Sequence, residues 1–144
     1  SLGVAHELFD VLDMQLAYMD SDEHDRHIAY VSHLSHITSF TLGLTVLDIE
    51  RNEKNIFNMA GSGFASTVRL AKSSADMWTP IFEQNAENLT EALDAYIEKL
   101  QVFREAIVSK DSNKTHELIK RGNDIRRILD GIELKNKEKN GKHN

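Results

Sequence analysis

Apolar positions in the second half of the chain recur in alternating steps of four and three, the spacing of a helix packed along one face. One set is Leu89, Leu93, Tyr96, Leu100, Phe103 and Ile107, and a second is Leu118, Gly122, Ile125, Leu129 and Ile132. The stretch "KDSNKT" separates the two sets and is rich in residues that interrupt helices. We therefore predict two long helices that form an antiparallel hairpin.

The first half contains a different helical region, which is almost uncharged. The 21 residues from His27 to Leu47 include no Asp, Glu, Lys or Arg. That length could cross a bilayer, but the segment holds three His, three Ser and three Thr, and such polar groups are costly in lipid. We predict instead a long helix buried in protein, from about Asp22 to Asp48, with Asp20 as its cap.

The first twenty residues have another character. "VAHELFDVL" has the pattern of a short amphipathic helix, and "MQLAYM" at 14–19 alternates like a β-strand. A lone strand needs a sheet to join, and nothing later in the chain resembles one. The prediction is an all-α bundle of about four to five helices over residues 22–135. Residues 1–21 would be the end of a preceding domain, and residues 136–144 a disordered polar tail.

Composition and charge exclude several partners. The net charge is −6, and residues 1–59 hold ten of the acids but only three of the bases. No basic stripe suited to a phosphate backbone is present, so we expect no nucleic-acid partner and, from the polar helix above, no membrane. The absence of cysteine excludes disulfides and zinc-thiolate sites. Without a secretory signal at the N-terminus, we expect a cytoplasmic protein.

Four of the seven histidines lie within Asp22–His36. His24 and His27 form one pair at three-residue spacing, and His33 and His36 form another, but the pairs point in roughly opposite directions around a helix. The Glu-x-x-His motif of metal-binding bundles is absent, so no metal is expected. We predict that His24 and His27 lie on the surface. For His33 and His36 the sequence leaves open a structural role or a binding pocket.

A glycine-rich turn, "AGSGF", precedes a predicted short helix at 65–73. Arg69 and Lys72 are the only Lys or Arg residues between Lys54 and Lys99. Backbone N–H groups of a first helical turn favour an anion, and a guanidinium grips a carboxylate or phosphate. The turn therefore predicts an anion pocket. The alternative is an ordinary helix–helix turn in which Arg69 pairs with an acid.

No catalytic nucleophile is evident. Ser32 and His36 are four residues apart and could hydrogen-bond on a helix, but no acid follows to orient the histidine. Trp78 is the only tryptophan, and a core position is the ordinary explanation for such a residue.

Three stretches, taken in order, resemble a known family, the prephenate and arogenate dehydrogenases. "HDRHIAYVSHLSH" is similar to their H-D-x-x-x-A-x-V-S-H-L-P-H segment. "AGSGFASTVRLAKSSADMW" is similar to G-G-G-F-x-D-x-T-R-I-A-x-S-x-P-x-M-W, and "IFEQNAENL" to the I-x-x-x-N-x-x-x-L that follows. The resemblance covers residues 20–107. Residues 108–144 carry no recognised signature.

The resemblance implies the C-terminal helical domain of an enzyme with two domains. The N-terminal Rossmann domain of that family binds NAD or NADP and carries the catalytic histidine, whereas the helical domain forms a homodimer and closes the active site. The complete enzyme converts prephenate to 4-hydroxyphenylpyruvate with loss of carbon dioxide, in tyrosine biosynthesis. Residues 1–21 would be the last part of the Rossmann domain. The chain alone would have no catalytic residue and no cofactor, and would be inactive.

Individual positions follow from the matched motifs. Ser32, His36 and Trp78 match residues that line the substrate pocket, and Arg69 matches the arginine that holds a substrate carboxylate. His33 matches an inner histidine with a packing role. Ser62 stands where the family has the middle glycine of its turn, so its place among the substrate-binding residues is an expectation by position. Ser35 replaces a proline, and Ser66 replaces an aspartate that can reach across the dimer.

The choice between prephenate and arogenate stays open, as does that between NAD and NADP. A stand-alone helical interaction or regulatory module without a pocket is the alternative function. It predicts that neither prephenate nor 4-hydroxyphenylpyruvate perturbs Arg69 or His36.

Overall fold

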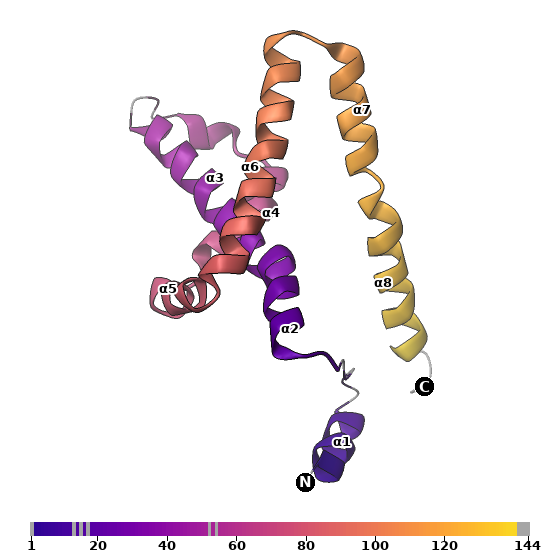
Figure 1. The fold of residues 1–144 in the computed structure, drawn as a ribbon. Coiled ribbons are helices and arrows are strands. Elements are labelled where there is room, and N and C mark those ends of the chain that lie inside the picture. Colours follow the sequence, from indigo (N-terminus) through magenta and orange to yellow (C-terminus); the bar gives the residue numbers. More distant parts are fainter. Residues whose placement is uncertain are drawn as a thin grey trace. The chain divides into compact units, whose positions relative to one another are not determined.

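The computed structural model describes residues 2–12, 14, 16, 18–51, 53 and 55–140, with the backbone alone at residues 2 and 134–140. The α-helices are α1 (Leu2–Val11), α2 (Ser21–Ile28), α3 (Leu34–Glu50), α4 (Ser62–Thr67), α5 (Ala75–Gln84), α6 (Ala86–Val108), α7 (Ser112–Gly122) and α8 (Ile125–Asn140) (Figure 1). A π turn, η1 (Ala29–His33), and two 3₁₀ turns, η2 (Ile56–Met59) and η3 (Arg69–Lys72), complete them. The all-α prediction is confirmed. The chain divides into two compact units, residues 1–93 and 94–144.

The strand expected over residues 14–19 is not formed by the described part of that stretch. Met14, Leu16, Tyr18 and Met19 lie in irregular structure, and residues 15 and 17 lie outside the described residues. The physical reason is that the described part of the chain offers no neighbouring strand with which this segment could pair. The short helix expected before it is α1.

The long helix expected over residues 22–48 is present as one continuous run formed by α2, η1 and α3. Its burial differs from the prediction, because in the uncharged stretch only Ala29, His33 and Ser39 are buried, whereas Val31, Leu44 and Leu47 are exposed. It begins after Asp20, whose carboxylate accepts a hydrogen bond from the backbone N–H of Glu23 at 2.8 Å. In the π turn the N–H of Leu34 donates to the carbonyl of Ala29, one residue further back than in an α-helix. No helix in the described part of the chain is both long enough and apolar enough to cross a membrane.

The segment after α3 differs from the prediction of a glycine loop followed by one helix over 65–73. Helix α4 already begins at Ser62, within the predicted loop, and Val68 (φ −91°, ψ 7°) interrupts the helical path before η3. Both η2 and η3 pack against α3. Arg69 therefore begins a separate 3₁₀ turn held on α3, and Ser62 lies at the start of a helix of only six residues.

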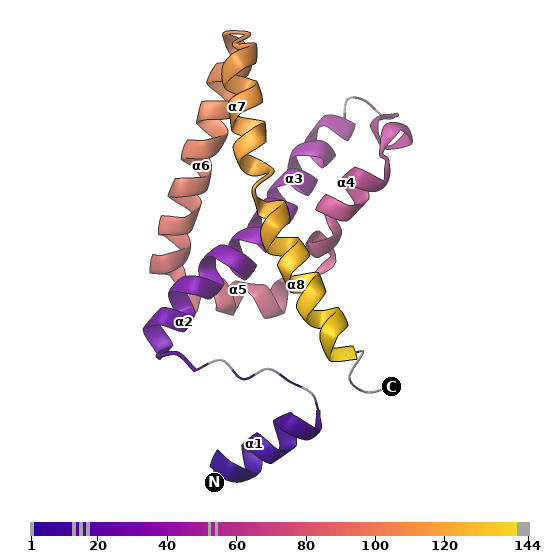
Figure 2. The same ribbon diagram turned by 90° about the vertical axis from the view of Figure 1, so that its right-hand side faces the viewer.

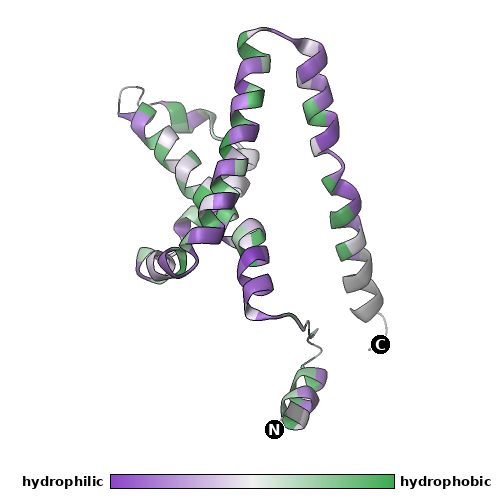
Figure 3. Cartoon of the chain, in the orientation of Figure 1, coloured by the Kyte–Doolittle hydropathy of each residue, from purple (hydrophilic) through white to green (hydrophobic). Residues whose placement is uncertain are grey.

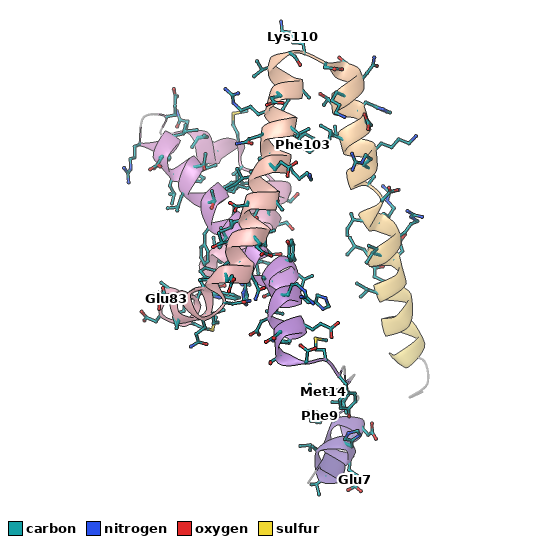
Figure 4. All side chains as sticks on the ribbon, viewed as in Figure 1. Glu7, Phe9, Met14, Glu83, Phe103 and Lys110 are labelled. Carbon is teal, nitrogen blue, oxygen red and sulfur yellow. The ribbon has the colours of Figure 1, made fainter. Side chains whose placement is uncertain are left out.

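The predicted antiparallel hairpin is present in the second unit, where α6 and α7 run side by side in opposite directions (Figure 1, Figure 2). Figure 4 shows Phe103 of α6 near α7, and Phe103 and Leu118 line a groove of about 630 Å³ between the two helices. The second apolar set is divided between α7 and α8, which begins at Ile125. Hydrophobic and hydrophilic residues alternate along these helices (Figure 3).

Helix α8 continues to Asn140 and so includes residues 136–140 of the expected polar tail; residues 141–144 lie outside the described part. The domain boundaries at residues 21 and 135 stay predictions.

The hairpin turns at Lys110, which has a left-handed backbone (φ 55°) (Figure 4). The N–H of Asp111 donates to the carbonyl of Ala106 at 2.9 Å, and that of Lys110 to Ile107 at 3.1 Å. This pair of bonds closes the C-terminus of α6 in a Schellman motif. Asp111 then caps α7 by accepting from the N–H of Lys114 at 2.9 Å, which explains why "KDSNKT" breaks the helix.

Glycine adopts a left-handed backbone without the steric cost borne by other residues. We therefore expect Lys110→Gly to raise the free energy of unfolding by about 0.5–1 kcal/mol. Lys110→Ala keeps the Cβ atom and removes the same charge, so it is the matched control and should leave stability almost unchanged. Urea denaturation followed by circular dichroism measures both. Equal stability of the two variants would contradict a strained left-handed turn.

Candidate functional site

The first unit contains an aromatic cluster built on the α3 end of the π turn. The imidazole of His36 stacks on the indole of Trp78 with ring centroids 3.6 Å apart and an interplanar angle of 28°. His33 approaches the same indole edge-on at 5.9 Å. Phe82, one turn after Trp78 on α5, lies 5.4 Å from the indole. The cluster therefore joins α5 to the α2–α3 run, and both histidines that follow Ser32 contact one tryptophan.

His36 is half-buried, and its ring is fixed on two sides. Its Nδ1 lies 3.0 Å from the backbone carbonyl oxygen of Ser32. A carbonyl only accepts, so Nδ1 carries the proton. The contact is thus with the backbone of Ser32 and not with its hydroxyl, as a Ser–His pair would require. No hydrogen bond of Nε2 is found among the described residues, which leaves this nitrogen to accept from a hydroxyl or, when protonated, to bind an anion.

Asn85, at the break between α5 and α6, organises the other histidine. Its side-chain NH₂ donates to the carbonyl of Asp25 at 2.7 Å and lies 3.4 Å from Nδ1 of His33. Its amide oxygen accepts from the side chain of Asn88 at 2.8 Å. Asn85 and His33 are both buried, at 8% and 6% exposure. A buried amide whose NH₂ group and oxygen are both hydrogen-bonded holds together the segments that it connects.

His33 is consequently held in its neutral form. Burial lowers the pKa of His33, and the neighbouring His36 and, more weakly, His24 lower it further, while Asp25 acts in the opposite direction. The neutral ring presents an unprotonated Nδ1 that can accept from Asn85. His33 is thus a buried ring packed against Trp78 and Phe82, and its packing role stays a prediction.

Arg69 lies in a segment that packs against α3 and is hydrogen-bonded to it through one hydroxyl. The Oγ of Ser39 donates to the carbonyl of Thr67 at 3.0 Å and accepts from the N–H of Ala71 at 3.1 Å. Ser39 is fully buried, whereas Arg69 is exposed. Within the described residues no acid lies within ion-pair distance of Arg69, so nothing there supports the alternative of an Arg69 ion pair inside a plain turn.

The structure thus brings some of the predicted site residues together and leaves others apart. Ser32, His36 and Trp78 come together, although Trp78 is mostly buried and its Nε1 has no hydrogen-bond partner among the described residues. Arg69 is tied to the same helix through Ser39. Ser62 is exposed, and nothing of the described structure joins it to the cluster.

His24 and His27 are exposed, as predicted. Within the described ranges, no group of three or more His, Asp or Glu side chains is arranged to hold a metal ion.

Sequence reasoning assigned no role to Ser39 or Asn85. Asn85 is the asparagine of the matched I-x-x-x-N-x-x-x-L segment, but the motif does not indicate what this asparagine does. Ser39 was noted only as a small residue of the uncharged helix that would allow close approach by a neighbouring segment. The signal that singles it out is its pairing with Thr67 and Ala71, which lie 28 and 32 residues later in the chain.

The all-helical fold agrees with the comparisons to known proteins. Residues 20–121 match the family described as "Prephenate dehydrogenase, dimerization domain". The chain therefore belongs to the prephenate dehydrogenase dimerization-domain family.

Solved structures agree with this assignment. Prephenate dehydrogenase from Aquifex aeolicus, in complex with hydroxyphenyl propionate and NAD⁺, is 29% identical with a TM-score of 0.79. Another structure of the Aquifex aeolicus enzyme is also 29% identical, with a TM-score of 0.76. Each match covers 89% of this chain and 45% of the Aquifex chain. Synechocystis arogenate dehydrogenase shares the fold at 21% identity and a TM-score of 0.72, over 89% of this chain and 47% of its own. The chain spans less than half the length of these relatives.

The buried His33 should make folding depend on pH. Its pKa is lower in the folded chain than its ordinary value of 6.5, so the folded state resists protonation. The stability that depends on neutral His33 is complete above about pH 6.5 and is lost as the pH falls towards the folded-state pKa. We expect a lower free energy of unfolding at pH 5.5 than at pH 7.5, measured by urea denaturation.

His33→Gln should flatten this dependence, whereas His27→Gln, at an exposed histidine, should leave it unchanged. An equal pH dependence in the wild-type chain and His33→Gln would show that another group is responsible.

Proposed function

We propose that this chain is the helical domain of a prephenate dehydrogenase that oxidatively decarboxylates prephenate to 4-hydroxyphenylpyruvate, and that it recognises the substrate. Arg69 binds a substrate carboxylate, and His36, Ser32 and Trp78 line the pocket beside it. Ser62 is a peripheral member of this site by position in the motif. Arogenate is the other substrate consistent with the family.

One observation carries this proposal: α3 contains His36 and, three residues later, Ser39. The hydroxyl of Ser39 is hydrogen-bonded to the backbone on either side of Arg69. Prephenate is a small dianion with a hydroxyl group. A guanidinium can bind one of its carboxylates, and a polar side chain can hydrogen-bond to its hydroxyl. Arg69 has no acid partner among the described residues, and the open Nε2 of His36 fits the second requirement. These two groups belong to elements that pack against each other.

The remaining chemistry of such an enzyme lies outside these residues. NAD or NADP supplies the hydride acceptor and is bound, in our proposal, by a dinucleotide-binding domain of which residues 1–21 are the end. The catalytic histidine belongs to that domain as well, so the chain alone is inactive. A cytoplasmic location and tyrosine biosynthesis are parts of the same proposal.

Arg69→Ala in the complete dehydrogenase tests the carboxylate role. Losing a charged hydrogen bond costs about 1.5–3 kcal/mol, so KM for prephenate should rise at least about tenfold. Lys72→Ala removes a charge from the same exposed segment and should change KM little. Steady-state kinetics measures both. An unchanged KM in Arg69→Ala would remove Arg69 from this role and favour a helical interaction module without a pocket.

We further propose that the domain forms a homodimer through its second unit. Large apolar side chains there are more than half exposed: Ile107, Val108, Ile119, Ile125, Ile128, Leu129 and Ile132. Those of α8 recur at helical spacing and form one stripe. A stripe of this kind is typical of a surface that is covered in an assembly.

Leu129→Lys should therefore shift the chain from dimer towards monomer at micromolar concentration, measured by sedimentation velocity. A buried lysine in an apolar interface would leave an unpaired charge. Asp130→Asn is the matched control, because it changes the net charge by the same amount on the neighbouring position. A wild-type chain that is monomeric at this concentration would contradict the dimer, and equal dimerisation of both variants would remove α8 from its interface.

A further inference from the structure

Ser39 is a fully buried polar residue in the middle of α3, and its hydroxyl uses both its donor and its acceptor function on the segment that contains Arg69. The bond to Thr67 lies two residues before Arg69, and the bond to Ala71 lies two residues after it. These are the hydrogen bonds found between α3 and residues 67–72 in the described structure.

The backbone that these bonds hold also packs against α3, but its own helical structure is short and interrupted. Helix α4 ends at Thr67, Val68 breaks the helical path, and η3 is a single 3₁₀ turn. Short turns of this kind have poorer internal hydrogen-bond geometry than an α-helix. An exposed guanidinium on such a turn is directed by its backbone, so the Ser39 bonds determine where Arg69 can reach.

We propose that Ser39 is a positioning residue for anion recognition, which fixes the turn of Arg69 against α3 so that the guanidinium is held ready for a carboxylate. This inference rests on the proposed role of Arg69 in substrate binding. Pre-organisation of this type strengthens binding because the ordering of the turn is completed before the ligand arrives. Ser39 touches no ligand itself.

Two isosteric variants separate the hydroxyl from the volume of the side chain. Ser39→Thr and Ser39→Val add the same bulk at a buried position, and only threonine keeps the hydroxyl. The first measurement is hydrogen exchange of the Ala71 amide by NMR. Exchange should be faster in Ser39→Val than in Ser39→Thr, while amides of α7, in the other unit, stay unchanged in both.

The second measurement is ligand binding, followed by the fluorescence of Trp78, the only tryptophan and the ring stacked on His36. The probes are hydroxyphenyl propionate, which is in complex with the Aquifex aeolicus enzyme, and its neutral amide. Ser39→Val should bind the acid about fivefold to tenfold more weakly than Ser39→Thr, the effect of one or two hydrogen bonds. Affinity for the amide should be equal in the two variants.

The Arg69→Ala background completes the test. If Ser39 acts through Arg69, Ser39→Val and Ser39→Thr should bind the acid equally weakly once each is combined with Arg69→Ala.

Equal acid affinity of Ser39→Thr and Ser39→Val, with Arg69→Ala still impaired, would overturn the positioning role and leave the proposed function intact. A loss that extends equally to the amide would also overturn it, because it would indicate a general disturbance of the fold. If the wild-type chain and Arg69→Ala have the same response to the acid, including none, the carboxylate role of Arg69 fails, and the positioning role fails with it. Equal exchange of the Ala71 amide would refute the tether independently of any ligand.

Discussion

The structure of the first unit depends on neutral polar groups that are buried in a helix without charges. From His27 to Leu47 the polar side chains are hydroxyls and imidazoles, and a buried one without a hydrogen bond would destabilise the fold. Ser39 meets this constraint with the backbone of residues 67 and 71, and His33 meets it with Asn85. The hydrogen bonds that satisfy the buried side chains of Ser39 and His33 therefore also hold residues 67–71 and Asn85 against this helical run. The same contacts therefore stabilise the fold and place the residues of the candidate site.

The π turn gives this arrangement its geometry. It ends at His33, so that the helix leaves the turn with His33 and His36 both directed at Trp78. The two rings are then used differently. His33 is buried and neutral, with its Nδ1 facing an amide donor. His36 is half-buried, with Nδ1 bonded to the Ser32 carbonyl. Such single π turns occur often at functional sites because they redirect side chains without ending the helix.

Periodicity predicted the parts of the fold that depend on local spacing. Helix α6 and its hairpin with α7 follow from apolar steps of three and four, and Asp111 and Lys110 account for the turn between them. The uncharged helix follows from the stretch without charged residues and from its cap at Asp20. The strand at 14–19, as far as its residues are described, and the single helix at 65–73 were wrong for different reasons. Alternating residues do not form a strand without a partner strand. Val68 leaves the helical conformation, and it follows Ser66 and Thr67, which are weak helix formers. The candidate site was predictable where motif and chemistry coincide, as at His36 and Trp78, and not where a contact joins distant residues. No local pattern connects Ser39 to Ala71, or Asn85 to Asp25, because these pairs form only when the chain is folded.

The departures from the family motif fit the same physical picture. Ser35 replaces a proline and donates its hydroxyl to the carbonyl of Val31 at 3.1 Å, inside the π turn. A serine hydroxyl can bond in this way to the carbonyl one helical turn before it. Ser62 and Ser66 are exposed, so neither replacement introduces a buried polar group without a partner. The substitutions therefore fall at positions where a hydroxyl is either hydrogen-bonded or solvated, while the buried hydroxyl at Ser39 and the rings at His36 and Trp78 hold the geometry on which anion recognition would depend.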